Sequence, residues 1–146
     1  MKAPIFQRSQ RLLLTIAVLF VAGSVLANEM IVPRGSSWKY HNSNQDLGGT
    51  GWQEFGYDDS GWSGPLPGPI GDNLEGGFQL CVSVIDIGQP VGNRFPVIYF
   101  RKGFSVANGG AYESLIVRLN RDDAALVYLN GVLLINDGVP DPPTFA

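Results

Sequence analysis

The stretch that decides the fold is Leu126-Val127-Tyr128-Leu129-Asn130-Gly131-Val132-Leu133-Leu134-Ile135, in which an Asn-Gly pair separates two runs of β-prone side chains. Asn and Gly tolerate the positive φ angles of a type I′ turn, and this turn joins two antiparallel strands with the correct twist. The stretch therefore predicts a β-hairpin. Because Ala125–Leu129 is apolar on both faces, we expect a central strand there, between two sheets packed face to face.

Outside the hairpin, the chain is divided into short β-rich runs. From residue 28 onward it has 18 Gly and 9 Pro in 119 residues, and no window of helical length with a helical apolar periodicity is free of these breakers. In residues 113–120, Leu115, Val117 and Leu119 occupy alternate positions, as in a strand that has one face on a core. The predicted fold class is all-β, an antiparallel β-sandwich, with strands at 36–40, 80–85, 97–106, 113–120, 124–129 and 132–135.

Residues 41–79 are predicted to be mostly loop. The segment 62–69 contains three prolines, and proline lacks the N–H donor that a ladder strand needs. We therefore expect no ladder strand in this segment. A loop this long is usually functional or held by its own side chains. The aromatic residues available to hold it are Trp52, Phe55, Tyr57 and Trp62.

Residues 1–27 have the pattern of a signal-peptide helix. A basic start with Lys2, Arg8 and Arg11 precedes an apolar run, and small residues surround the predicted cleavage point after Ala27. The 16 apolar-region residues 12–27 are fewer than the roughly 20 that a spanning helix needs, so we expect no stable membrane anchor. The predicted domains are the signal peptide, 1–27, and one exported module, 28–146, located in the periplasm, at the cell surface or in the medium.

Charge and cysteine content exclude several classes of function. Removal of residues 1–27 takes three of the ten Lys and Arg and none of the thirteen Asp and Glu, which leaves a formal charge of −6. Such a chain repels phosphate backbones, so no nucleic-acid partner is expected. Cys81 has no second cysteine to pair with, and its apolar neighbours predict burial. One His and one Cys are too few for a zinc finger.

Four motifs follow one another in the exported part, at residues 31–40, residues 51–62, residues 99–106 and residues 119–131. In these motifs and their order, the exported part resembles the galactose-binding-like jelly-roll modules at the N-terminus of secreted bacterial multidomain proteins, some of which are metallophosphoesterases, glycoside hydrolases or surface proteins. One departure is the absence of a Gly-Tyr pair before Gly71-Asp72. The resemblance also implies closing strands beyond Ala146, so the module is expected to be incomplete, a fragment of a longer jelly roll.

Three residues are predicted to bind a ligand. Trp52 and Tyr128 could offer a ring to the apolar face of a sugar, and Arg121 could hold a hydroxyl or a carboxylate. The alternatives are that the rings fill the core and that Arg121 forms a local ion pair at a strand end. Asp122 and Asp123 could bind a structural calcium ion, or they could serve as turn caps. The same two alternatives apply to the pair Asp58-Asp59.

These observations favour an exported, non-catalytic module that binds carbohydrate or acts as a scaffold against an adjoining domain. No set of residues with the spacing of a catalytic site is recognisable, so no enzyme is expected within this chain. One alternative is the N-terminal accessory part of a secreted hydrolase, such as a metallophosphoesterase, with its catalytic domain beyond residue 146. A further alternative is a purely structural surface or adhesion domain.

Overall fold

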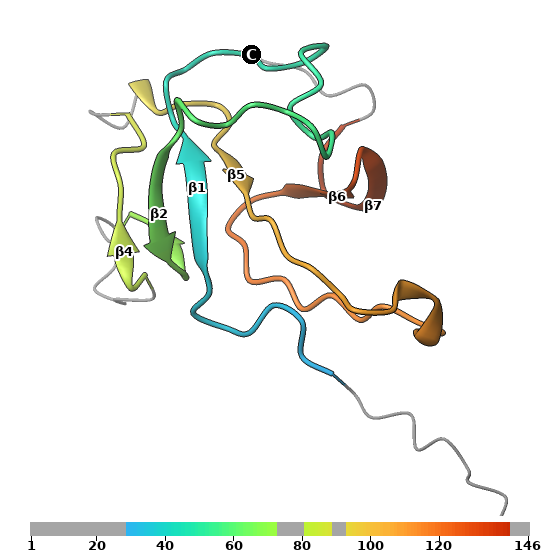
Figure 1. Ribbon diagram of the computed structural model, residues 1–146. Coiled ribbons are helices and arrows are strands. Elements are labelled where there is room, and N and C mark those ends of the chain that lie inside the picture. The colour runs from blue at the N-terminus through green and yellow to red at the C-terminus, as the bar shows by residue number, and fades with distance from the viewer. Residues whose placement is uncertain (1–28, 73–80, 89–92, 141–146) are drawn as a thin grey trace, which may run out of the picture.

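The described part of the protein is built from short strands. The computed structural model describes residues 29–72, 81–88 and 93–140, and these contain no α-helix (Figure 1). Within the same residues, no helix has the length and apolar character to cross a membrane. The predicted signal peptide, 1–27, lies outside the described residues. The all-β prediction is confirmed at this level, with the strands in three small sheets.

The largest sheet has three antiparallel strands in the order β2-β1-β5. Strand β1, Ser37–His41, lies between β2, Ser63–Pro67, and β5, Tyr99–Arg101 (Figure 1). The register pairs Lys39 with Arg101 and His41 with Tyr99. The predictions of strands at 36–40 and 97–106 are confirmed, although β5 is shorter than expected. The His41 ring packs on Trp62 and Tyr99.

Strand β2 contradicts the expectation that the proline-rich segment forms no ladder strand. Within the described segments it pairs only with β1, on one side, so alternate residues need no N–H donor and two prolines are tolerated. A register shift between Trp38 and Tyr40 of β1 gives β2 one extra residue. Gly64 lies in this irregularity with a φ of +91°, and a Cβ there would be 2.8 Å from the Trp38 carbonyl oxygen. Glycine is therefore required for the close approach.

The predicted hairpin is confirmed as β6, Ala125–Leu129, and β7, Val132–Asp137. Asn130 and Gly131 have φ angles of +50° and +84°, as a type I′ turn requires. A bulge leaves Leu134 as the extra residue of β7. The prediction that β6 is central is wrong for the described residues, where it pairs with β7 alone. An apolar pattern on two faces does not by itself supply a second neighbouring strand.

A parallel pair, β3, Ile70–Gly71, and β4, Ser83–Val84, forms the third sheet. Beside it lies Cys81, which is half-buried and donates its thiol hydrogen to the Asp72 carbonyl oxygen at 3.6 Å. Burial, followed by the charge of Asp72, raises the pKa of the Cys81 thiol. The predicted burial of Cys81 is thus confirmed in part, and its surroundings oppose thiolate formation.

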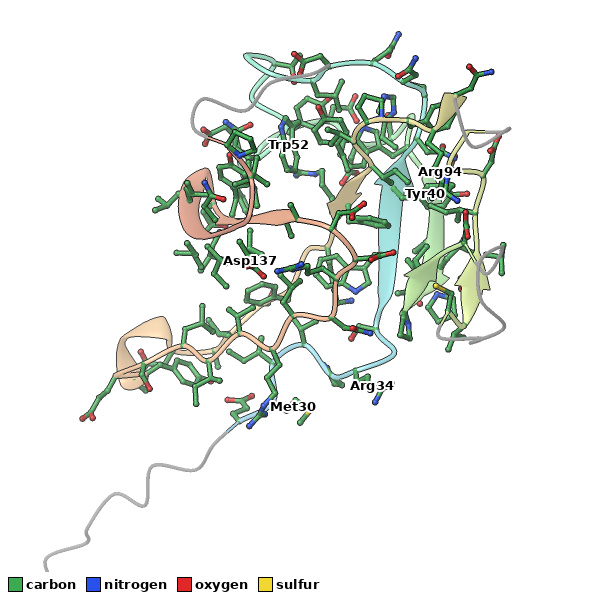
Figure 2. The ribbon with its side chains drawn as sticks, turned by 180° about the vertical axis from the view of Figure 1, so that it is seen from behind. Met30, Arg34, Tyr40, Trp52, Arg94 and Asp137 are labelled. Atoms are coloured by element: carbon green, nitrogen blue, oxygen red, sulfur yellow. The ribbon has the colours of Figure 1, made fainter. Side chains whose placement is uncertain are left out.

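The predicted strand at 113–120 is not formed, because these residues have no ladder partner among residues 29–72, 81–88 and 93–140. They belong to a limb, residues 103–121, whose two arms run side by side and are joined by the short 3₁₀ helix η2, Gly109–Ala111, in both views (Figures 1 and 2). Alternation alone therefore did not produce a strand with a buried face. The large apolar side chains of its second arm are exposed: Leu115, Ile116, Val117 and Leu119.

The core lies between the β2-β1-β5 sheet and the long loop at 42–62. Tyr99 is 5% exposed, and its hydroxyl accepts a hydrogen bond from the Leu47 N–H at 3.0 Å. Burial raises the pKa of Tyr99. Trp52 and Trp62 each place a ring against Tyr99, and Tyr57 packs on Trp62. Three of the four aromatic residues predicted to hold the loop do so, whereas Phe55 is 84% exposed.

Candidate functional site

Trp52 and Tyr128, two of the predicted ligand-binding residues, are brought together. Their rings meet edge to face with centroids 5.5 Å apart, and the Trp52 ring also meets Tyr99 at 4.9 Å. Trp52 therefore lies between the hairpin and the three-stranded sheet, as its position in Figure 2 shows. Both rings are half-buried. Their contacts make them a joint between two parts of the molecule.

The loop carrying Trp52 also contacts the tip of the hairpin. The Gly131 N–H donates to the Gln53 carbonyl oxygen at 2.9 Å. Gly131 has a φ of +84°, which favours glycine, and a Cβ there would lie 2.5 Å from a Glu54 carboxylate oxygen at the end of a flexible side chain. The hairpin is thus held at two points, its strand β6 through Tyr128 and its turn through Gly131.

The third predicted ligand-binding residue, Arg121, forms a local ion pair. Its Nε lies 2.7 Å from Oδ2 of Asp137 in β7, and its guanidinium also donates to the Asp123 carbonyl oxygen. The pKa of Asp137 is lowered, chiefly by the hydrogen bond from Arg121. Both side chains are exposed. Arg121 therefore connects the end of the limb to the hairpin. This is the local ion pair that was the alternative to ligand binding.

Asp122 and Asp123 have turn contacts. The Asp123 N–H donates to Asp122 Oδ1 at 3.1 Å, and Asp123 has a φ of +59°. Within the part of the chain that the structure describes, no group of three or more His, Cys, Asp or Glu side chains is arranged to hold a metal ion. A structural calcium ion at this pair stays a prediction. The other acidic pair divides its roles, since Asp58 Oδ1 accepts from the Ser60 N–H at 2.9 Å while Asp59 points elsewhere.

Asp59 belongs to an open groove that sequence reasoning missed. The groove has a volume of about 410 Å³ and lies beside one end of β1 and β5. Such a volume falls within the range of small-molecule sites, roughly 300–1,000 Å³. The lining residues come from both strands, from the long loop and from β2: Ser37, Lys39, Phe55, Tyr57, Asp59, Pro65, Arg101, Lys102 and Gly103.

The centre of the groove is a triad of charges. Lys39 and Arg101 are directly opposite each other in the β1–β5 ladder, where two like charges repel. Asp59 relieves this repulsion, with its Oδ1 2.7 Å from Lys39 Nζ and its Oδ2 3.1 Å from Arg101 Nε. The pKa of Asp59 is lowered, first by the Lys39 hydrogen bond and then by that of Arg101, against the opposing effect of burial. The carboxylate is therefore ionised at neutral pH.

Arg101 also anchors the long loop to the sheet. Its Nη1 donates to the carbonyl oxygens of Trp52 and Glu54. Its guanidinium carbon lies 5.2 Å from the centre of the Tyr57 ring and 6.0 Å from that of Trp62, within the range of cation–π attraction. These contacts fix the backbone on either side of Gln53. They therefore hold Phe55 and Tyr57 at the groove.

Lys102 contributes an ammonium group and Phe55 contributes an exposed ring to the lining of the groove. In the described residues, the Lys102 ammonium makes one hydrogen bond, to the Ser37 carbonyl oxygen at 3.2 Å, and has no carboxylate partner. Two of its three N–H groups are therefore available to a ligand. Phe55 exposes its ring to solvent. The groove thus combines a fixed charged floor with one cation and one ring that a ligand can contact.

A sequence signal for this groove was present. Two of the quoted motifs contain Trp38-Lys39-Tyr40 and Tyr99-Phe100-Arg101-Lys102, and antiparallel pairing of these strands brings their cations together. The register was not predictable, because a shift of one residue would place Arg101 on the other face. Asp59 was interpreted as a turn residue, and its distance of 42 positions from Arg101 concealed the ion pair.

No protein-family model, curated protein or solved structure matches the chain.

Proposed function

We propose that this protein is an exported, non-catalytic carbohydrate-binding module of the galactose-binding-like jelly-roll type, and that the groove beside β1 and β5 is its binding site. The observation that carries the proposal is Phe55, which is 84% exposed at the edge of a groove lined by hydrogen-bonding side chains. Small-molecule sites combine aromatic surface with a few convergent polar groups, and the groove has both.

The groove offers the two kinds of contact that a sugar needs. The Phe55 ring can cover the C–H face of a pyranose ring, which is apolar. Lys102 and the Lys39–Asp59 pair can donate to and accept from ring hydroxyls, and charged partners strengthen such hydrogen bonds. Because Arg101 holds the long loop, little conformational entropy is lost when a ligand binds.

Export is part of the same proposal and rests on the leader pattern of residues 1–27. A module that leaves the cytoplasm meets cell-wall and environmental polysaccharides. A role as a scaffold for an adjoining domain is compatible with glycan binding, and the exposed apolar side chains of the limb favour it.

The test is affinity electrophoresis of the exported chain in gels that contain soluble polysaccharides, neutral and acidic. We expect at least one polysaccharide to retard migration, and we expect Phe55→Ala to abolish the retardation. Phe104→Ala is the matched control, because Phe104 is also an exposed phenylalanine but does not line the groove. A folded chain that no polysaccharide retards would contradict the proposal and favour the purely structural alternative.

A further inference from the structure

We infer that the groove selects acidic sugars, with a carboxylate-bearing pyranose as the preferred unit. This inference rests on the proposed function and specifies the substrate class of the same site. Its basis is the sign of the charge in the groove, where three cations, Lys39, Arg101 and Lys102, accompany a single carboxylate, Asp59.

The local charge opposes that of the whole exported chain. The chain without residues 1–27 carries a formal charge of −6, whereas the groove lining has an excess of two positive charges. A net-negative protein attracts anions poorly in general. A polyanion that binds must therefore use a local positive site, and at physiological ionic strength charges further than about 8 Å from it are largely screened.

Structural needs account for part of this positive charge. Asp59 neutralises one cation, and Arg101 is committed to the Trp52 and Glu54 carbonyl oxygens and to Asp59. Lys102 has no such commitment within the described residues, since its single hydrogen bond is to a backbone carbonyl. Its ammonium can therefore pair with a carboxylate that a ligand brings, as a charge-assisted hydrogen bond.

The apolar part of the lining argues for a ring that carries the charge, in preference to a small free anion. Phe55 and Tyr57 line the groove together with the cations. A free inorganic anion would leave the Phe55 ring in water, whereas a uronate presents a C–H face and a carboxylate on one rigid unit. The groove volume of about 410 Å³ is also larger than an inorganic anion needs.

The experiment compares polygalacturonate with its fully methyl-esterified form, which has the same ring but no charge. Binding of both to the exported chain is measured by titration calorimetry at 0.15 M salt. We expect the free acid to bind about tenfold more tightly, the contribution of one charge-assisted hydrogen bond. We expect Lys102→Gln to abolish this preference, Lys102→Arg to retain it, and Phe55→Ala to weaken the binding of both forms.

Arg34→Gln is the matched charge control, because Arg34 is exposed and is not part of the groove lining. This variant should prefer the free acid over the methyl ester as strongly as the unchanged chain does. Equal affinity for the acid and the ester would overturn the inference and leave the proposed function intact. Equal effects of Lys102→Gln and Arg34→Gln, or tighter binding of dextran sulfate than of polygalacturonate, would show general attraction of polyanions and overturn it as well. Binding of neither form overturns it, and the wider polysaccharide panel then decides the proposed function separately.

Discussion

The three-stranded sheet with its long loop and the hairpin with its limb contain similar side chains in different surroundings. Each region has one Arg–Asp ion pair, but Arg101 and Asp59 are 16% and 28% exposed, whereas Arg121 and Asp137 are 36% and 46% exposed. The first pair joins residues 42 positions apart and the second joins residues 16 apart. Apolar and charged residues are therefore shielded where a distant segment covers them, and the same residue types remain in water where none does.

Trp52 connects the two regions, so its removal should have the largest effect. The Trp52→Ala variant loses ring contacts to Tyr99 in β5 and to Tyr128 in β6 at once. We expect the free energy of unfolding to fall by about 2–3 kcal/mol, less than for a fully buried tryptophan because Trp52 is half-buried. Urea denaturation followed by circular dichroism measures the loss.

Phe55→Ala is the matched control within the same loop. Because the Phe55 ring is exposed, we expect the free energy of unfolding to change by no more than about 0.5 kcal/mol. Equal losses for the two variants would mean that Trp52 is not the joint between the sheet and the hairpin.

The hairpin and the joint show how much of the fold local sequence can predict. The turn at Asn130 and Gly131 depends on two residues that adopt positive φ, so the sequence predicted the hairpin correctly. The central position of β6 depended on neighbouring strands, and periodicity carries no information about which strand pairs with which. The same limit explains the error at 113–120, where the alternation was that of a strand but the described part of the chain supplies no partner strand.

The candidate site was predictable only in part for the same reason. Trp52 and Tyr128 were singled out by residue type, and they do meet, but their contact is with each other. The groove depends on the register of β1 with β5 and on the return of Asp59 from a distant loop. Such contacts depend on tertiary structure, and no local motif specifies them.

Removing Arg101 should have the second-largest effect and should separate the two ion pairs. Arg101→Gln breaks the hydrogen bond to Asp59 and loosens the loop, which is held through the Trp52 and Glu54 carbonyl oxygens. We expect a loss of about 2 kcal/mol, since hydrogen bonds to charged groups contribute about 1.5–3 kcal/mol. Arg121→Gln is the control and should cost clearly less, because its pair with Asp137 is exposed. The reverse order, measured by urea denaturation, would refute the distinction between the two regions.

Gly131→Ala should have a smaller effect and should test the contact between the hairpin turn and the loop. The φ of +84° disfavours alanine, and its Cβ would lie 2.5 Å from the Glu54 carboxylate. We expect a loss of about 1–2 kcal/mol in the free energy of unfolding. In a Glu54→Ala background the loss should shrink to the backbone contribution. Gly56→Ala is the control, since a Cβ there meets nothing within 4 Å. An unchanged loss in the Glu54→Ala background would show that the Glu54 side chain moves aside at little cost and that the backbone conformation alone disfavours alanine.

Acid should lower the free energy of unfolding by protonating Asp59 in the groove, and this effect should be the smallest of the four. Lys39 and Arg101 hold the pKa of Asp59 below its ordinary value of 3.8, so the folded protein binds this proton less readily than the unfolded chain does. The stabilisation is therefore fully present above pH 3.8 and is lost as the pH falls through the lowered folded pKa.

In the Asp59→Asn variant, the free energy of unfolding should be lower at neutral pH and should fall less steeply as the pH is lowered. Asp137→Asn, which removes the other lowered carboxylate, should change the slope less because solvent screens that exposed pair. Thermal unfolding measured from about pH 6 to pH 2 compares the slopes, and an Asp59→Asn slope equal to that of the unchanged chain would show that Asp59 has the same pKa in the folded and unfolded states.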